Sequence, residues 1–356
     1  MLPATMTDSN VPDEPARRRT RPAGLRLASA RALAVVVAGT IGLALGACEA
    51  SPPPRWQVVH RHLAGGLLSV WGRSAADVWT VGGDDGEGPT VLHLDGGAWT
   101  RVPTGDRGDL WWVHGWDDGT VMVSGADGRI LRWDGAEFRA MDTPAHDAIV
   151  FGLWGPTPDD VFAVGGVGRS AGFVWHWDGA AWSTVALPSS FDGRSLFKVW
   201  GTASDDAWVC GTDGALMHWD GAALTDVPSG TTRTLFTVHA LGDRVAAVGG
   251  LGAATIVERG PRGFTDVTPP LAAQLFGVAL GTAGAAWGVG LSGTVVHDDG
   301  TGWALLDTRL DLGETLHGVW IDPDGGVWAA GGQVLATPLR DGALVYFGTA
   351  DMSPEP

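Results

Sequence analysis

The sequence predicts an all-β protein, a seven-bladed β-propeller of four-stranded antiparallel blades. A phrase of the form L-aromatic-x-V-W-G recurs seven times, and each copy is followed by further short apolar segments. Apolar and small residues alternate too quickly for a helix, and Asp-Gly between segments is typical of a β-hairpin. The 55 glycines, 21 prolines and 19 tryptophans among 356 residues fit many short strands joined by tight turns.

Each repeat supplies four strands in a fixed order. The recurring phrase is the first; DVWTVGG (77–83), VLHLDGG (91–97) and AWTRV (98–102) exemplify the other three. The first strands are LLSVWG (67–72), LWWVHG (110–115), FGLWG (151–155), LFKVWG (196–201), LFTVHA (235–240), LFGVAL (275–280) and LHGVWI (316–321). Four strands repeated seven times predict seven blades around an axis.

Two segments compete to close the ring. Residues 55–59 (RWQVV) look like a fourth strand and precede the first strand of blade one, so we expect them to complete blade seven. Residues 343–347 follow an Asp-Gly pair and could occupy the same position. On this reasoning, one of the two segments is an extra edge strand or a tail.

The N-terminal segment has the form of an export signal. Six arginines precede an uncharged apolar run at 32–47, which is shorter than the roughly 20 residues that span a bilayer. The run ends Leu-Gly-Ala-Cys48, which resembles the lipobox of bacterial lipoproteins and implies a lipid on Cys48. We therefore expect a signal peptide (1–47), the lipidated cysteine with a Pro-rich tether (48–54), a propeller (55–350) and a tail (351–356). The predicted location is the bacterial cell envelope, on the inner or the outer membrane.

The charge balance excludes some partners. Residues 1–48 contain six arginines and three acids, which leaves 17 basic and 37 acidic residues beyond them, a net charge of −20. Such an acidic chain is not expected to bind nucleic acid or anionic lipid headgroups through bulk charge. Cys210, the other cysteine, lies in a repeated strand and is expected to be a small buried side chain without a disulfide.

Comparison of the repeats predicts a charge-assisted hydrogen bond within individual blades. In three blades an Asp before the second strand accompanies a His in the third strand, and in a fourth blade both charges are reversed. The pairs are Asp77 with His93, Asp160 with His176, Asp206 with His218, and Arg244 with Glu258. A metal site is not expected, because equivalent histidines in neighbouring blades should lie far beyond the ~4 Å over which ligands share an ion.

The repeats resemble Asp-box and sialidase-like propellers, including photosystem II assembly-factor-like propellers, and repeat lipoproteins of GC-rich bacteria. The resemblance spans 55–347 and rests on LHLDGGAW, VWHWDGAAW and VVHDDGTGW, which keep Asp, Gly and Trp but place His where the box has Ser or Thr. The resemblance implies the fold. It does not imply an activity, because one fold hosts many activities. Sialidase chemistry needs a Tyr nucleophile with a Glu and three arginines, and Tyr346 is the only tyrosine, so a sialidase is not expected.

No other catalytic set stands out. The sequence contains no GxSxG, HExxH, P-loop or CxxC motif, so we expect no catalytic residue and no cofactor. Asp84, Asp85 and Glu87 could hold Ca²⁺ through oxygen ligands, but they lack EF-hand spacing and a solvated loop is the favoured interpretation.

Trp112 and one variable face are the candidates for binding. Tryptophans at repeat positions, such as Trp71, Trp154, Trp200 and Trp320, are explained by packing between blades. The counterparts of Trp112 are Ser69, Gly152, Lys198, Thr237, Gly277 and Gly318, so we expect it to face the central channel. The loops that join strands two to three and four to one share a face and vary in length, which favours recognition there. The ligand-binding candidates are Asp84, Asp85, Glu87, Arg107, Trp112, Arg169, Phe191 and Arg194.

These observations favour a monomeric, non-catalytic envelope propeller that binds a protein or glycan. A divergent hydrolase or lyase acting on glycans and an envelope assembly factor remain alternatives.

Overall fold

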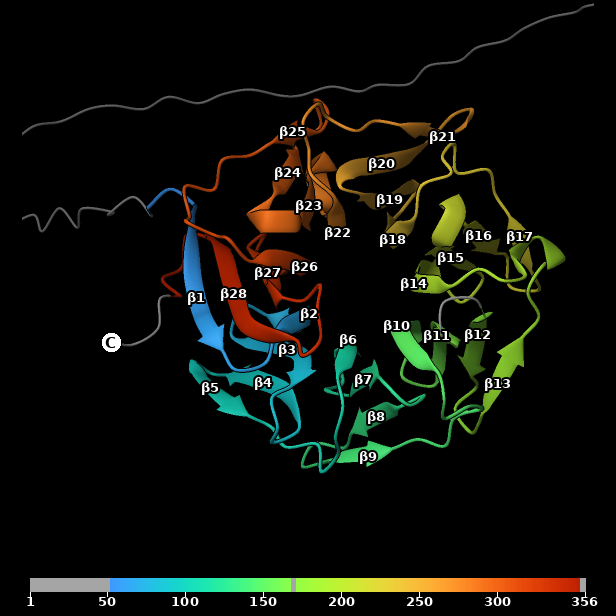
Figure 1. Ribbon diagram of the computed structural model, residues 1–356, viewed down its shortest axis with the longest axis horizontal. Helices are drawn as coiled ribbons and strands as arrows, with labels where there is room; N and C mark the ends of the chain where they lie inside the picture. The colour runs from blue at the N-terminus through green and yellow to red at the C-terminus, as the bar shows by residue number, and fades with distance from the viewer. Residues whose placement is uncertain (1–51, 168–170, 353–356) are drawn as a thin grey trace, which may run out of the picture. The chain divides into compact units, whose positions relative to one another are not determined.

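The computed structural model describes residues 52–352 with a gap at 168–170. In this part the chain forms seven four-stranded antiparallel sheets, arranged as blades around an axis (Figure 1). The prediction of a seven-bladed β-propeller is confirmed. The predicted signal peptide, Cys48 and the end of the predicted tail lie outside the described residues. Within the described ranges, no helix is both long enough and apolar enough to cross a membrane.

The first strand of every blade lies next to the axis. These inner strands are β2 (Leu67–Ser74), β6 (Leu110–Gly115), β10 (Ile149–Thr157), β14 (Leu196–Ala203), β18 (Leu235–Leu241), β22 (Leu275–Leu280) and β26 (Thr315–Ile321). The second strands are β3 (Asp77–Asp84), β7 (Val121–Gly125), β11 (Asp160–Val167), β15 (Asp206–Gly211), β19 (Arg244–Leu251), β23 (Ala286–Gly290) and β27 (Val327–Gln333).

The third and fourth strands form the outer half of each blade. The third strands are β4 (Pro89–Asp95), β8 (Ile130–Trp133), β12 (Ala171–Trp177), β16 (Leu216–Trp219), β20 (Ala253–Gly260), β24 (Val295–Asp298) and β28 (Arg340–Gly348). The fourth strands are β5 (Ala98–Arg101), β9 (Phe138–Ala140), β13 (Trp182–Val185), β17 (Leu224–Asp226), β21 (Gly263–Asp266), β25 (Ala304–Leu305) and β1 (Arg55–Leu63). Four short 3-10 helices occur between described strands: η1 (Ser189–Phe191), η2 (Thr212–Gly214), η3 (Thr282–Gly284) and η4 (Leu291–Gly293).

Both segments that competed to close the ring belong to blade seven. Its strand order is β1-β28-β27-β26, so 343–347 lie in the third strand and 55–59 in the fourth. The expectation that one of them is an extra edge strand or a tail is wrong, because it left blade seven without a third strand. Pairing of the first and last strands joins the two ends of the propeller, with Trp56 opposite Phe347.

A β-bulge occurs at the same place in all seven inner strands. At each bulge the strand register skips one residue, such as Leu68 between Leu67 and Ser69 or Phe197 between Leu196 and Lys198. The equivalent shifts occur in β6, β10, β18, β22 and β26. A bulge leaves one residue unpaired and re-aims the side chains beside it. The skipped residues are Leu68, Trp111, Phe151, Phe197, Phe236, Phe276 and His317.

Indole rings and glycines explain how neighbouring blades pack. A Cβ on Gly72 would lie 2.9 Å from the Trp320 ring, and one on Gly115 would lie 2.4 Å from the Trp71 ring. Glycine at the end of the V-W-G phrase therefore leaves room for the tryptophan of the preceding blade. The hydrophobic core accordingly lies between blades, as in the cluster that joins Trp154 and Leu196.

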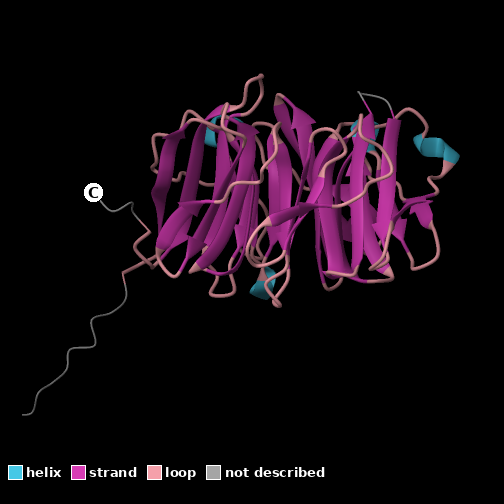
Figure 2. Cartoon of the chain, turned by 90° about the horizontal axis from the view of Figure 1, so that it is seen from below, coloured by secondary structure: helices cyan, strands magenta, loops and turns pink. Residues whose placement is uncertain are grey.

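The ring has two unlike faces (Figure 2). We call the side with the strand four-to-one and two-to-three connections the loop face, and the side with the one-to-two and three-to-four turns the turn face. β1 is a fourth strand, so it runs from the turn face at Arg55 to the loop face at Leu63.

Candidate functional site

The loop between β3 and β4 is held together by Asp84. Its carboxylate accepts hydrogen bonds from the backbone N–H groups of Gly86 (2.8 Å), Gly88 (3.2 Å) and Gly108 (2.7 Å). The bond from Gly108, which belongs to the following β5–β6 loop, is the first cause that lowers the pKa of Asp84. Asp84 thus fixes two neighbouring loops to one another.

The carboxylate of Asp85 is also held by hydrogen bonds within the protein. Its carboxylate accepts two hydrogen bonds from Arg101, at 2.6 and 2.9 Å, and this pairing lowers the pKa of Asp85. Glu87 is exposed on the same loop. In the described part of the chain, no group of three or more His, Cys, Asp or Glu side chains is placed to hold a metal ion.

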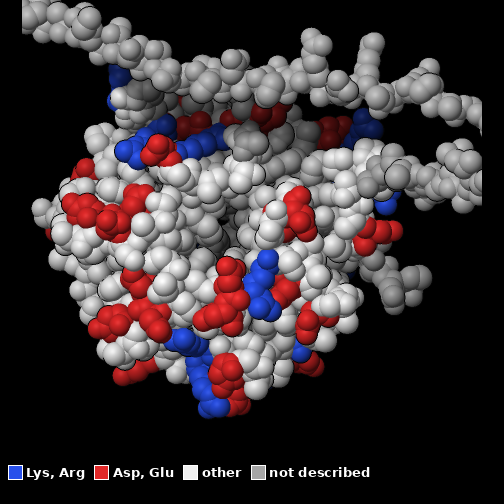
Figure 3. All heavy atoms as spheres, turned by 180° about the vertical axis from the view of Figure 1, so that it is seen from behind, with Lys and Arg blue, Asp and Glu red and all other residues white. Residues whose placement is uncertain are grey.

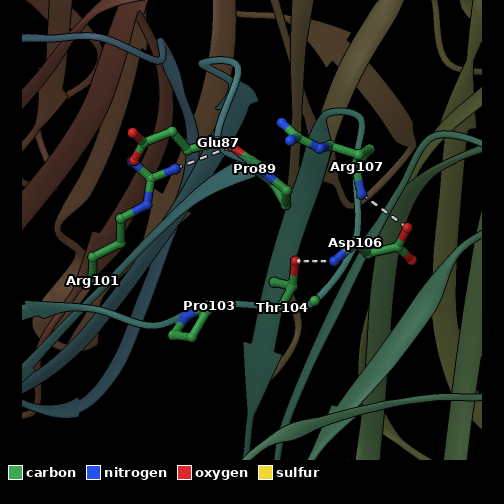
Figure 4. Close-up of a pocket in the computed structure, with 9 residues that line it drawn as sticks. Glu87, Pro89, Arg101, Pro103, Thr104, Asp106 and Arg107 are labelled. Atoms are coloured by element: carbon green, nitrogen blue, oxygen red, sulfur yellow. Dashed lines mark hydrogen bonds between the residues drawn. The ribbon is translucent and has the colours of Figure 1, made fainter.

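A cleft of about 540 Å³ separates the β3–β4 loop from the β5–β6 loop. Glu87 and Arg101 lie on one wall, and Asp106 and Arg107 lie on the other (Figure 4). The Arg107 side chain is 67% exposed and donates a hydrogen bond to the Gly86 carbonyl. The described residues that line this cleft, which we call the rim cleft, include no aromatic side chain. It presents fixed charges of both signs on ordered loops.

The other candidates on the loop face have different surroundings. Phe191 is only 1% exposed, because η1 turns its ring into the core cluster of blades three and four. Phe191 is therefore a packing residue rather than an exposed contact. The Arg194 guanidinium lies 5.2 Å from the centre of the Phe191 ring. Arg169 lies outside the described residues.

Trp112 lies at the axis. Its indole Nε1 donates to the Leu153 carbonyl in the next blade at 2.8 Å. The ammonium Nζ of Lys198 lies 3.5 Å from the centre of the Trp112 ring and donates to the Phe151 carbonyl at 2.9 Å. Gly152 of blade three lies beside the lysine side chain. A Cβ on Gly152 would lie 3.0 Å from Lys198 Cδ, so glycine leaves room for that side chain.

Lys198 is the only lysine in the chain, and sequence reasoning did not single it out. Its side chain is 3% exposed, and no described carboxylate forms an ion pair with it. Burial lowers the pKa of Lys198 to about 7. The available signal was a lone lysine at an inner-strand position where other blades carry Ser, Thr, Gly or Trp.

A closed ring of aromatic side chains surrounds the axis at the loop face. It comprises the residues that the strand register skips at the bulges of six inner strands, namely Trp111, Phe151, Phe197, Phe236, Phe276 and His317. Neighbouring ring centroids are 5.1 to 6.1 Å apart. Leu68 fills the seventh position and packs against Val334 and Leu339 of the β27–β28 loop. We call these six rings the aromatic collar.

Below the collar, the axis contains a cavity of about 230 Å³. Its walls include Trp71, Trp112, His114, Trp200, His239 and Trp320. Trp71, His114 and Trp320 also line a wider hollow among the turns of the turn face, so the cavity opens on that side. Figure 3 shows the ring hollowed at its centre. Three of the four tryptophans expected only to pack between blades therefore line this axial cavity as well, and Trp154 does not.

The paired side chains are in hydrogen-bond contact within their blades. His Nε2 lies 2.9 Å from the carboxylate in the Asp77–His93 pair, and 2.7 Å in both the Asp160–His176 and Asp206–His218 pairs. Arg244 donates to Glu258 at 2.6 Å and also to Asp298 of the next blade at 2.7 Å. These groups join strands two and three near the turn face.

Cys210 is fully buried opposite Lys198 in the β14–β15 pair. Burial raises the pKa of its thiol to about 12, so the thiolate needed of a nucleophile does not form near neutral pH.

Comparisons with known proteins show the fold and no family. No protein-family model and no curated protein matches the chain. The solved structure of YCF48 bound to D1 peptide is 14% identical over 83% of this chain and 97% of that chain, with a TM-score of 0.63. A streptogramin B lyase is 13% identical over 83% and 99% (TM-score 0.65). The WD40 propeller domain of Doa1 is 11% identical over 85% and 100% (TM-score 0.65).

Proposed function

We propose that this chain is a monomeric, non-catalytic propeller, lipid-anchored in the bacterial cell envelope, that binds a protein partner through its loop face. The rim cleft carries the proposal. Its walls are ordered before any partner arrives, because Asp84 and Asp85 hold both loops. Preorganised loops lose little entropy on binding.

The layout of the loop face favours a protein over a glycan. Aromatic side chains of the collar lie at its centre, and the charged rim cleft lies at its edge. Protein interfaces have this arrangement of an apolar centre within a polar periphery. Aromatic rings also supply much of the binding energy in such interfaces. The described lining residues of the rim cleft include no aromatic ring on which a sugar could stack.

The similar structures are consistent with this proposal through the fold alone. YCF48 is a propeller that was solved with a peptide, so a propeller of this size accommodates a polypeptide ligand. The streptogramin B lyase shares the same fold, which hosts many unrelated activities.

The proposed anchor gives the loop face an outward orientation. Arg55 starts β1 at the turn face, six residues after Glu49. A Pro-rich tether of this length reaches about 20 Å. With lipid on Cys48, the turn face would lie toward the membrane and the loop face would lie away from it.

Two charge-matched variants test the proposal. Glu87→Ala/Arg107→Ala removes two exposed charges of the rim cleft. Glu137→Ala/Arg139→Ala removes a Glu from the β8–β9 turn and an Arg from β9, near the opposite face. The Arg107 and Arg139 side chains are both 67% exposed, so the variants are matched in charge and exposure. A photo-crosslinking residue at 87 or at 137 in living cells identifies the neighbour of each face.

A protein crosslinked from 87 and absent from 137 is expected. Its purified form should bind wild type and the 137/139 variant equally, and the 87/107 variant at least tenfold more weakly. Equal binding to all three proteins, or crosslinking only to polysaccharide, would overturn the proposal.

A further inference from the structure

Five exposed residues on the loop face form an uncharged surface at blade five. They are Leu251, Gly252 and Ala253 of the β19–β20 hairpin, and Pro270 and Leu271 of the β21–β22 loop. We call them the apolar strip. We propose that the apolar strip is a second contact for the protein partner, whose surface places an apolar pocket over the strip and a carboxylate beside it. This inference rests on the proposed function and deepens it, because it defines the chemistry of the partner.

The two leucines of the apolar strip are unusually exposed. Leu271 is 95% exposed and Leu251 is 74% exposed, the two highest values among the large hydrophobic side chains of the described residues. Single exposed leucines are common on protein surfaces, whereas a contiguous apolar patch marks an interaction site. Whether these two leucines belong to one surface therefore depends on how their loops are joined.

Backbone pairing joins the two loops. Ala253 forms an antiparallel bridge with Ala273. The Gln274 N–H donates to the Gly252 carbonyl at 3.0 Å, and the Gly252 N–H donates to Gln274 Oε1 at 3.0 Å. The exposed leucines thus lie on adjacent loops that are held in place before a partner arrives, and such loops lose little entropy on binding.

Leu271 keeps a backbone conformation that is unfavourable for leucine. Its φ is 64°, in the left-handed region that glycine normally occupies. Thr268 Oγ1 accepts a hydrogen bond from the Ile256 N–H at 2.7 Å. The Ala272 carbonyl accepts one from the Ala254 N–H at 3.0 Å, so the loop is fixed on both sides of Leu271. Because its side chain is 95% exposed, packing within the chain does not offset this strain, and strain of this kind is concentrated at binding sites.

The charges around the apolar strip define the partner surface. No Asp, Glu, Lys or Arg occurs in residues 245–257 or 267–297, which include both loops. A charged partner surface would lose its hydration here without gaining an ion pair, so the matching surface is apolar. Arg233 lies at the edge of the strip, where its guanidinium donates to the Ala253 carbonyl at 3.4 Å. It is exposed and forms no ion pair with a described carboxylate, so it is available to a carboxylate of the partner.

The position of the apolar strip favours a protein over a lipid surface. The strip and the rim cleft lie on opposite sides of the axis (Figure 1). A protein that contacts both crosses the aromatic collar between them. The proposed anchor turns this face away from the membrane, so lipid is not the expected contact.

Photo-crosslinking in living cells tests the proposal. Benzoylphenylalanine is placed at position 271, at position 87 and, as a control, at position 305. Leu305 is 45% exposed in β25, the outer strand of blade six. The same protein should be crosslinked from 271 and from 87, and it should not be crosslinked from 305.

Titration of that purified protein measures the contribution of the leucines. Leu251→Ser/Leu271→Ser should bind it at least about tenfold more weakly than wild type does. The matched control, Leu241→Ser/Leu305→Ser, removes two leucines that are 42% and 45% exposed outside the strip, and it should bind like wild type.

Two more variants separate charge and folding from contact. Arg233→Gln should weaken binding and reduce its salt dependence, whereas Arg262→Gln should do neither, because Arg262 is an exposed arginine of the β20–β21 turn on the turn face. Leu271→Gly should also weaken binding. Its urea midpoint should equal or exceed that of wild type, because glycine accepts a φ of 64° without strain.

The outcomes distinguish the apolar strip from the rim cleft. A protein captured at 87 and not at 271 would overturn the strip and leave the rim cleft standing. A protein captured at 271 whose binding is weakened by Leu251→Ser/Leu271→Ser and not by Glu87→Ala/Arg107→Ala would support the strip and overturn the rim cleft.

Four other results would overturn the inference. They are crosslinking from 271 only to lipid, polysaccharide or another copy of this chain; wild-type affinity of Leu251→Ser/Leu271→Ser; equal affinity of Arg233→Gln and Arg262→Gln; and a lower urea midpoint of Leu271→Gly, which would make Leu271 a residue that supports the fold.

Discussion

Replacing Lys198 by Met should stabilise the protein at neutral pH, by an amount that disappears in alkali. The wild-type ammonium is buried against Trp112 and Phe151 without a described carboxylate. Methionine keeps a long apolar stem and removes the charge. The change also leaves the Phe151 carbonyl without its bond from Lys198, which offsets part of the gain by about 1 kcal/mol.

The magnitude follows from the pKa of Lys198. Burial lowers that pKa from 10.5 to about 7, which at about 1.4 kcal/mol per pH unit corresponds to on the order of 5 kcal/mol of unfavourable free energy. Between these two pH values the unfolded chain binds the proton and the folded chain does not. The contribution of Lys198 to the free energy of unfolding therefore rises with pH across this interval and is constant below it.

Urea unfolding of both proteins measures the effect. The free energy of unfolding of wild type, minus that of Lys198→Met, should increase by about 2 kcal/mol between about pH 7 and about pH 9. Taking the difference cancels groups that titrate alike in both proteins. Because Lys198 is the only lysine, ¹³C-lysine NMR gives its pKa from a single side-chain signal. A pKa near 10.5 together with a pH-independent difference would refute the reasoning.

Three further predictions concern other parts of the chain. Mass spectrometry of the membrane fraction should find a lipid on Cys48, and Cys48→Ser should release the chain from the membrane; a variant that stays processed and anchored would contradict the lipoprotein assignment. Cys210 should resist thiol reagents in the native protein and react on unfolding, because its buried thiol has a pKa raised to about 12. A double-mutant cycle of Asp77→Ala and His93→Ala should give a coupling of about 1 kcal/mol in urea unfolding, and additive effects would show that the 2.9 Å contact contributes nothing.

The fold was predictable from the repeats, because neighbouring blades pack against one another through the same kinds of residue at equivalent positions. Gly72 and Gly115 recur in the V-W-G phrase since an indole of the preceding blade occupies the space of a Cβ. Ring closure was harder to predict. The third strand of blade seven, β28, lacks the His and the following Asp-Gly that mark β4, β12, β16 and β24, so local pattern did not reveal its place.

The candidate sites were less predictable, because they depend on contacts between different repeats. Asp84 looks like a free carboxylate in sequence, yet it binds N–H groups of two loops. Phe191 looks like an exposed loop residue, and a 3-10 turn buries it. The inner-strand bulge brings Trp112 of blade two under Lys198 of blade four, a contact that no single repeat contains.

The direction of β1 leads to a last prediction about orientation. If a lipid on Cys48 holds the start of β1 near a bilayer, the turn face is shielded and the loop face is free. Single cysteines at Glu87 and Glu137 report on the two faces, and the buried Cys210 does not interfere. In vesicles, a bulky polyethylene glycol maleimide should modify Glu87→Cys faster than Glu137→Cys, and detergent should equalise the rates.

Equal rates in vesicles would mean that the tether lets the propeller tumble freely. Faster modification at 137 would mean that the loop face lies against the membrane. Either result would remove the argument that the anchor presents the rim cleft to a partner, while the fold and the axial cavity would stand unchanged. With the expected order of rates, the axial cavity opens toward the bilayer.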